Sequence, residues 1–307
     1  MRKIFGSKNL KIENSAVALG NFDALHKGHI AIISDMLSFA KAHKLVSVVY
    51  MFKDSPNKGE LGINSLDKRL EILEEIGVNI VVVEEFSDIK NTPYDEFVEE
   101  YIKKRMDAKA VFVGFNYRFG KGAEGNAKIL KELCRKNSVD VFIKDCVEID
   151  GETVSSSNIK DFITEGEMEK TREFMTRGFL VSGIVIKGKQ LGRTIGFPTA
   201  NIEYPKGVVL PKEGVYITLC KIGENKYYSI TNVGEKPTVS DERKNIETAI
   251  GDFDGDIYGE QIEIEFCKRI RDIIRFDSLD KLKDQLFIDM NMAKTFFDTE
   301  KNNIDLL

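Results

Sequence analysis

The stretch GNFDALHKGH, residues 20–29, decides how the first half of the chain folds. It follows a short apolar run, Ala16–Leu19, and leads directly into Ile30–His43, where apolar residues recur at the three- and four-residue spacing of an amphipathic helix. A strand, a glycine-containing turn and a helix are therefore expected here. The unpaired backbone N–H groups at the start of such a helix favour a bound phosphate.

Alternation of strands and helices continues through the first half of the chain. The further strand candidates are Val46–Phe52, Ile80–Val83, Val111–Val113 and Val141–Ile143. Leu66–Ile76 has a helical period and is followed by Gly77, a residue that commonly ends helices. A third helix is expected with Thr92 as N-cap and Pro93 in its first position. This alternation predicts a Rossmann-like α/β domain, a parallel sheet covered by helices on both faces.

The pattern changes after about residue 178. Strands without intervening helices are expected at Phe179–Lys187, Val215–Ile222, Lys226–Thr231 and Gln261–Phe266. Closely spaced strands with glycine-containing turns predict a small antiparallel β-barrel, and a C-terminal amphipathic helix is expected with Ser278 as its N-cap. We therefore expect a first domain over residues 1–160, a charged helical linker over 161–178 and a second domain over 179–307.

The composition is that of a globular protein. The chain has 307 residues, of which 42% are hydrophobic and 31% charged, enough for two domains with cores of their own. The net charge of −5 argues against a nucleic-acid partner, which requires a basic surface. No segment resembles a secretory signal or reaches the length of about 18 apolar residues that a membrane span needs. We expect a cytoplasmic protein without membrane contact, whose cysteines are buried free thiols: Cys134, Cys146, Cys220 and Cys267.

Two of the three histidines of the chain lie in the stretch quoted first. His26 and His29 are three residues apart at the start of the expected helix, so both imidazoles can donate hydrogen bonds to one anion. Gly20 and Gly28 would let the backbone approach that ligand closely. The structural alternative is an ordinary helix start with two exposed imidazoles.

A second glycine-rich stretch, GIVIKGKQLGRTIGFPTAN, covers residues 183–201. Its glycines predict a loop able to wrap phosphates. Thr199 and Asn201 follow two residues apart in an extended segment, so their side chains can face the same side. A hydroxyl and an amide oxygen are ligands suited to Mg²⁺ that bridges the phosphates of ATP.

The first half resembles a known family at three places. Residues 20–29 are similar to the GxFDxxHxGH signature of the HxGH nucleotidyltransferases, residues 113–120 (VGFNYRFG) to a flavin-binding segment of FAD synthetase modules, and residues 155–160 (SSSNIK) to their triphosphate-binding motif. The resemblance implies that His26 and His29 are catalytic and hold phosphates, and that Asn116 and Arg118 bind FMN. It implies ATP contacts by Gly20, Phe22, Asp23, Gly28, Ser155, Ser156, Ser157 and Lys160.

This half departs from the family pattern at several positions. Asn116 stands where the family has Asp, Lys160 where it has Arg, and Lys53-Asp-Ser-Pro56 lacks the histidine of an EPHP-like stretch. Ala123 and Asn126 replace an expected Arg and Asp. Lysine lacks the planar fork with which arginine binds phosphate. These departures motivate an alternative in which the first domain is degenerate or regulatory.

The second half resembles riboflavin kinases. The GRxxGFPTAN signature matches at residues 192–201, and further segments match at residues 230–238, 246–259 and 271–279. The resemblance implies that Glu247 is the general base for the 5′-hydroxyl of riboflavin and that Thr199 and Asn201 hold the metal. It implies ATP and phosphate contacts by Gly183, Gly188, Gly192, Arg193, Gly196, Pro198, Thr199 and Asn201, and riboflavin contacts by Asn232, Arg271 and Phe276.

Together these matches identify the chain as similar to the prokaryotic bifunctional riboflavin kinase/FMN adenylyltransferase (FAD synthetase) family. The expected reactions are phosphorylation of riboflavin to FMN and adenylylation of FMN to FAD, with ATP as co-substrate and Mg²⁺ in both steps. Riboflavin, FMN, FAD and ATP are the expected partners. The departures in the first half leave a monofunctional riboflavin kinase with a degenerate or regulatory first domain as the alternative. Two further alternatives stay open: a flavin- or nucleotide-responsive binding protein, and a first half that transfers nucleotide to another phosphorylated substrate.

Overall fold

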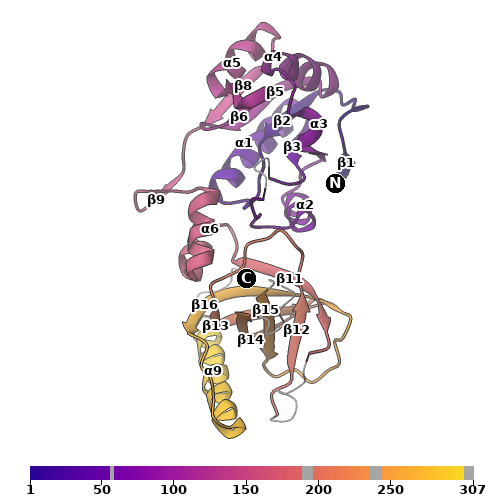
Figure 1. Ribbon diagram of the computed structural model, residues 1–307. Coiled ribbons are helices and arrows are strands. Elements are labelled where there is room, and N and C mark those ends of the chain that lie inside the picture. The colour runs from indigo at the N-terminus through magenta and orange to yellow at the C-terminus, as the bar shows by residue number, and fades with distance from the viewer. Residues whose placement is uncertain (56–58, 189–195, 236–243, 301–307) are drawn as a thin grey trace. The chain divides into compact units, whose positions relative to one another are not determined.

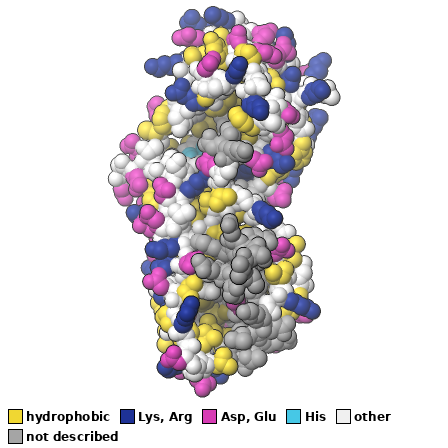
Figure 2. All heavy atoms as spheres, in the orientation of Figure 1, with side chains coloured by type: hydrophobic (Ala, Val, Ile, Leu, Met, Phe, Trp, Pro, Cys, Tyr) yellow, Lys and Arg dark blue, Asp and Glu magenta, His cyan; other side chains and the backbone are white. Residues whose placement is uncertain are grey.

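The computed structural model describes residues 1–55, 59–188, 196–235 and 244–300. The chain divides into two compact units, Met1–Ile159 and Lys160–Leu307. No helix in these described ranges is long and apolar enough to cross a membrane. On the face shown in Figure 2, acidic and basic side chains are interspersed over each unit.

The first unit contains a parallel sheet, as predicted. Its strands are β1 (Arg2–Phe5), β2 (Ser15–Leu19), β3 (Val46–Phe52), β4 (Ile80–Glu84), β5 (Ala108–Gly114) and β8 (Asp140–Lys144). Their order across the sheet is β1-β4-β3-β2-β5-β8, and every pair is parallel. From β2 the chain runs outward through β3 to β4, which lies beside the edge strand β1, and then resumes on the other side of β2 with β5. The sequence pattern did not predict β1, a four-residue edge strand.

Helices cover both faces of this sheet (Figure 1). The helices α1 (Lys27–His43) and α2 (Leu66–Glu75) pack on one face, against residues such as Ala16 and Ala18. The π-helix η1 (Phe97–Arg105) and α5 (Ala127–Lys136) pack on the other, against residues such as Val17 and Leu19. Because successive strand residues point to opposite faces, β2 contributes to both cores and is buried along its whole length. The prediction of a sheet covered on both faces is confirmed.

The remaining elements of this unit are short. They are α3 (Phe86–Ile89), α4 (Tyr94–Glu96), β6 (Arg118–Phe119), η2 (Lys121–Ala123), β7 (Gly125–Asn126), β9 (Glu148–Ile149) and β10 (Glu152–Thr153). The predicted start of the third helix was wrong by one residue: Pro93 is the N-cap of α4, and Thr92 lies outside. The reason is the extended ψ of 151° at Pro93, which keeps it out of the helix.

Cys146, expected to be buried, is exposed between β8 and β9, whereas the other three cysteines are buried.

The second unit is a closed antiparallel barrel, again as predicted. Its strands are β11 (Phe179–Ile186), β12 (Thr199–Glu203), β13 (Gly214–Ile222), β14 (Asn225–Glu235), β15 (Lys244–Ile250) and β16 (Gln261–Arg271). They pair in the order β11-β12-β15-β14-β13-β16, and the ring closes between β16 and β11. The helix α9 (Leu279–Glu300) follows Ser278, whose Oγ accepts from the Lys281 N–H at 3.3 Å. It packs along β13 and β14 (Figure 1).

The segment 161–178, expected as a linker, lies in the second unit. It contains the end of α6 (Ser156–Glu165) and all of α7 (Met168–Phe174), and α7 packs against β16 and β11. The Lys212 N–H donates to the Ile163 carbonyl at 3.2 Å, and Lys268 forms an ion pair with Glu169 at 3.0 Å. These contacts join the segment to the barrel.

Candidate active sites

The loop between β2 and α1 has an unusual backbone. Phe22 and Leu25 both adopt the left-handed conformation, with φ of 50° and 47°, although neither is glycine. The Phe22 ring lies over Gly20, where a Cβ atom would come within 3.0 Å of the ring. Glycine at position 20 therefore makes room for the aromatic ring that covers the end of β2.

His26 caps the helix that follows this loop. Its Nδ1 accepts a hydrogen bond from the His29 backbone N–H at 3.1 Å, so a neutral His26 carries its proton on Nε2 and can donate from there. The His26 and His29 rings are stacked, with centroids 3.6 Å apart. A Cβ at position 28 would lie 3.2 Å from the His26 ring, which explains Gly28.

Both imidazoles are neutral at pH 7. Burial lowers the pKa of His26 to about 4 and lowers the pKa of His29 well below its usual range, with the neighbouring His26 adding to the second effect. His29 Nδ1 and Asn21 Oδ1 are buried and have no hydrogen-bond partner among the described residues. Buried polar atoms are normally paired, so these two are available to a ligand.

A cavity of about 490 Å³ opens beside His29. It lies at the carboxyl ends of β2, β3 and β5, where the strand order reverses between β2 and β5. Ligands of open α/β sheets bind at such a switch point. The cavity brings together five of the residues predicted to contact substrates: Gly20, Phe22, His29, Asn116 and Arg118.

The other residues predicted for this site, His26 among them, are not among those that line the cavity. The Asp23 carboxylate is buried and accepts from the Ile63 N–H at 2.9 Å. Ser155 Oγ accepts from the Asn158 N–H at 3.2 Å, while Ser156, Ser157 and Lys160 lie in α6. These contacts give Asp23 and Ser155 structural roles, and their contact with ATP stays a prediction.

Asn126, one of the departures from the family pattern, has a structural explanation. Its Oδ1 accepts from the Lys128 and Ile129 N–H groups, both at 3.0 Å, which makes it the N-cap of α5. Asparagine and aspartate cap helices about equally well. Ala123 differs, because it lines the cavity directly.

Several residues of this cavity were missed from the sequence. Asn21, Tyr50 and Phe52 line it, and the Tyr50 hydroxyl donates to the buried Glu84 carboxylate at 3.0 Å. Tyr50 and Phe52 end a strand that had been predicted, so the rule that ligands bind at the carboxyl ends of parallel strands could have pointed to them.

The barrel brings together the polar residues predicted for its site. Asn201 of β12 pairs with Glu247 of β15, and Glu247 pairs in turn with Asn232 of β14. Thr199 lies two residues before Asn201 on the same face, and its hydroxyl donates to the Glu247 carboxylate. Three adjacent strands thus present a carboxylate, a hydroxyl and two amides side by side.

The glycines of the stretch 183–201 do not all lie in a loop that could wrap phosphates. A Cβ on Gly188 would lie 2.2 Å from the Asn201 amide nitrogen, so the Asn201 side chain lies against this glycine. Gly183 lies inside β11, where a Cβ would meet the Glu203 carbonyl oxygen at 2.5 Å. Close approach of β11 and β12 therefore explains Gly183, which is not in a loop. Gly192 and Arg193 lie outside the described residues, and Gly196 is the first described residue after them.

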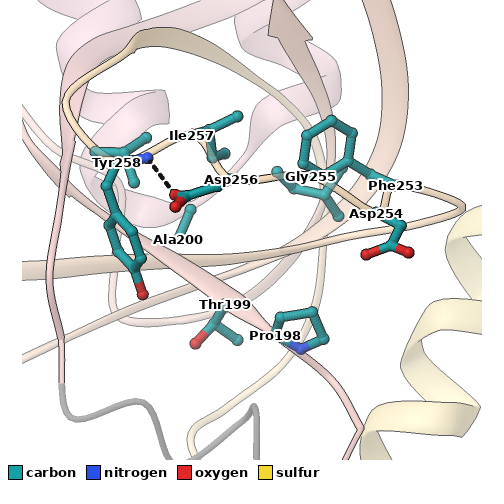
Figure 3. Close-up of a pocket in the computed structure, with 11 residues that line it drawn as sticks. Pro198, Thr199, Ala200, Phe253, Asp254, Gly255, Asp256, Ile257 and Tyr258 are labelled. Atoms are coloured by element: carbon teal, nitrogen blue, oxygen red, sulfur yellow. Dashed lines mark hydrogen bonds between the residues drawn. The ribbon is translucent and has the colours of Figure 1, made fainter.

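A second cavity, of about 340 Å³, lies beside Thr199 and Pro198. Its opposite wall is the loop that follows β15, with Phe253, Asp256 and Tyr258. Figure 3 shows the hydroxyl groups of Thr199 and Tyr258 directed to the same side of the cavity. The Asp256 carboxylate accepts from the Tyr258 N–H at 3.1 Å and shapes the loop. These wall residues belong to the segment 246–259 that resembles riboflavin kinases, but no individual role was predicted for them from the sequence.

Arg271 and Phe276, predicted to bind riboflavin, lie at and after the end of β16. The Arg271 guanidinium donates to both carboxylate oxygens of Asp289 on α9, including a contact of 2.6 Å from Nη2. Asp289 is 1% exposed, so this ion pair fastens α9 to the barrel. Phe276 is half-buried.

Comparison with known proteins gives two family matches. Residues 8–158 match the family model described as FAD synthetase, and residues 175–297 match the one described as riboflavin kinase. The two matched ranges cover both cavities.

Individual relatives match along nearly the whole chain. The bifunctional riboflavin kinase/FMN adenylyltransferase of Escherichia coli (strain K12) is 30% identical over 98% of this chain and 99% of its own. The Bacillus subtilis (strain 168) protein of the same description is 29% identical over 92% of each chain. A crystal structure described as a macrolide-efflux protein from Streptococcus pneumoniae is 31% identical, with a TM-score of 0.87 over 96% of this chain and 99% of that one.

Proposed function

The chain belongs to the bifunctional riboflavin kinase/FMN adenylyltransferase family, and we propose from this that each unit carries one of the two reactions. The second unit phosphorylates riboflavin to FMN. The first unit adenylylates FMN to FAD. Both use ATP as the donor.

In the kinase reaction, the 5′-hydroxyl oxygen of riboflavin attacks the γ-phosphorus of ATP, and ADP leaves. Glu247 accepts the hydroxyl proton. The contact of Thr199 with Glu247, beside Asn201 on the paired strand, is the observation that carries this assignment. ATP occupies the neighbouring cavity, between Pro198 and the loop that contains Tyr258.

The hydroxyl oxygen of Thr199 and the amide oxygen of Asn201 fit Mg²⁺, a cation that prefers oxygen ligands. When bound there, Mg²⁺ would neutralise charge on the phosphates of ATP. The Asn201 side chain lies against Gly188, and Asn201 pairs with Glu247 across β12 and β15. The side chains would hold the cation and orient the phosphates, while Glu247 receives the proton.

In the adenylylation reaction, a phosphate oxygen of FMN attacks the α-phosphorus of ATP, and pyrophosphate leaves. His26 Nε2–H and the His29 ring stand at the start of α1, where N–H groups and the helix dipole favour phosphate. As neutral donors they stabilise the charge that develops on the phosphate oxygens. Asn116 and Arg118 line the same cavity as His29 and contact the flavin nucleotide.

A riboflavin kinase with a silent first unit is the second candidate, motivated by Asn116, Ala123, Asn126 and Lys160. The match of residues 8–158 to the FAD synthetase model favours two activities. The intact cap, cavity and unpaired polar atoms around His29 favour them as well.

The test is chromatography of the products made by the purified chain with ATP and Mg²⁺. Riboflavin in the first incubation and FMN in the second should both yield FAD. Formation of FMN alone from riboflavin, with no FAD from FMN, would contradict the role of the first unit. Absence of FMN from riboflavin would contradict the role of the second.

A further inference from the structure

A buried arginine joins two walls of the first cavity. Arg69, on the first turns of α2, is 4% exposed. Its Nη1 donates to the carbonyl oxygens of Asn21 at 3.1 Å and Phe52 at 2.9 Å, and its Nη2 donates to the Lys53 carbonyl. These carbonyls lie at or just after the ends of β2 and β3, and both Asn21 and Phe52 line the cavity. The guanidinium therefore fixes the distance between the two strand ends.

Burial of the Arg69 guanidinium is unfavourable for the stability of the fold. Its hydrogen bonds to the described residues all go to neutral backbone carbonyls, and its Nε is buried without a partner there. Burial lowers the pKa of Arg69, and the nearby Asp23 and Asp54 offset part of that effect. An apolar side chain of similar length would avoid the desolvation of a charge. A role in holding the carbonyls that border the cavity explains why a charged residue is buried at this position.

The Asn21 carbonyl stands immediately before the left-handed Phe22. Fixing this peptide fixes the turn that places the Phe22 ring over Gly20 and edge-on to the His29 ring, at a centroid distance of 5.2 Å. Neighbouring residues support the same loop, because the Asn64 side chain donates to the Asp23 carbonyl at 2.8 Å. Residues 63–69 thus brace the loop that leads to the catalytic histidines.

We propose that Arg69 is a positioning residue for adenylyl transfer. It holds the Asn21 and Phe52 carbonyls, and through Phe22 it sets the orientation of His29 toward the cavity. It acts on the loop and does not touch the substrates. This assignment rests on the proposed function of the first unit.

The test compares Arg69→Met, Arg69→Lys and a matched control, Arg105→Met. Arg105 is a partly buried arginine of the first unit, where its Nη1 donates to the Ser7 carbonyl at 3.1 Å and its guanidinium covers the Tyr101 ring, outside the cavity. With FMN and ATP, Arg69→Met should lower kcat about 100-fold while each KM changes less than about threefold, because misplaced groups mainly affect the transition state. Arg69→Lys, which retains one donor group, should recover part of the loss. Arg105→Met should keep the wild-type kcat.

A second readout does not depend on activity. In ¹⁵N-histidine-labelled protein, the imidazole resonances of His29 should shift in Arg69→Met and Arg69→Lys and stay in place in Arg105→Met. Unchanged His29 resonances in either Arg69 variant, or an unchanged kcat in Arg69→Lys, would overturn the proposal. A wild-type chain that makes no FAD would refute the proposed function, while shifted His29 resonances would still support the positioning role. If Arg69→Met does not fold, Arg69→Lys decides the outcome.

Discussion

The hydroxyl of Thr199 donates a hydrogen bond to the carboxylate of Glu247, across the pair formed by β12 and β15. The two residues are 48 positions apart in the sequence, and each comes from a different conspicuous motif. The barrel brings them together, because β12 and β15 are neighbours in it although β13 and β14 lie between them in the sequence. A proton acceptor and the groups suited to a metal–phosphate complex thereby meet on one face.

Replacing Glu247 by Gln should abolish FMN formation and leave FAD formation from supplied FMN unchanged. Glutamine keeps the size of the side chain and its contact with Thr199 but is a very weak base, so a loss of about 10²–10⁴-fold in kcat is expected. Both rates are measured by product chromatography on the same preparation. Unchanged kinase turnover would remove Glu247 from its assigned role.

Replacing Gly188 by Ala tests the place of Asn201. The added methyl group would stand 2.2 Å from the Asn201 amide nitrogen, so that amide has to move. We expect a higher KM for ATP in the kinase reaction, with FAD formation from FMN as the internal control. A kinase with wild-type KM and kcat would show that the position of the Asn201 amide does not matter.

Replacing His29 by Ala should have the reverse effect of the Glu247 variant. The imidazole beside the cavity is lost, so FAD formation from FMN should fall by about 10²-fold or more, while FMN formation from riboflavin continues. Steady-state rates of both reactions check this. FAD synthesis at the wild-type rate would contradict the assignment of the first cavity.

His26 should make the stability of the first unit depend on pH. Its pKa is about 4 in the folded chain and about 6.5 in the unfolded chain. Between these values the unfolded chain binds more protons, so the free energy of unfolding decreases as the pH falls from 6.5 to 4. His26→Asn keeps a capping oxygen but does not titrate, so thermal unfolding measured across this range should depend less on pH. Equal pH dependence in both proteins would contradict a buried neutral His26.

Replacing Asp289 by Asn should destabilise the second unit. The carboxylate is buried and binds Arg271, and removal of one partner of a buried ion pair costs about 3 kcal/mol. Asp277→Asn is the control, because the Asp277–Lys281 pair is exposed and should contribute little. Calorimetric unfolding compares the two variants. Equal midpoints would mean that the Arg271–Asp289 pair does not fasten α9.

The sequence predicted the two architectures because their periodic patterns are long. Strand–helix alternation indicated the parallel sheet, and alternating residues such as those of Gln261–Phe266 indicated the barrel. Short elements were missed or misplaced: β1 has only four residues, and the start of α4 depended on the ψ angle of Pro93. Such local choices are settled by pairing and packing and not by periodicity.

Site residues that belong to a sequence motif were predicted. Residues that reach a site only through the tertiary structure were missed. His29 and Glu247 belong to recognisable motifs. Arg69 has the sequence environment of an ordinary polar residue on an amphipathic helix, and only the fold brings the carbonyls of Asn21 and Phe52 to it. Phe253 became a wall residue because its loop folds back over β12.

Complementation of two inactive variants tests the central claim, that two separate sites in this chain make FAD from riboflavin. With riboflavin, ATP and Mg²⁺, Glu247→Gln alone should give neither product, and His29→Ala alone should give FMN and no FAD. A mixture of the two should give FAD, because one chain supplies the FMN that the other adenylylates. A mixture that accumulates FMN without FAD, or FAD from His29→Ala alone, would contradict the account.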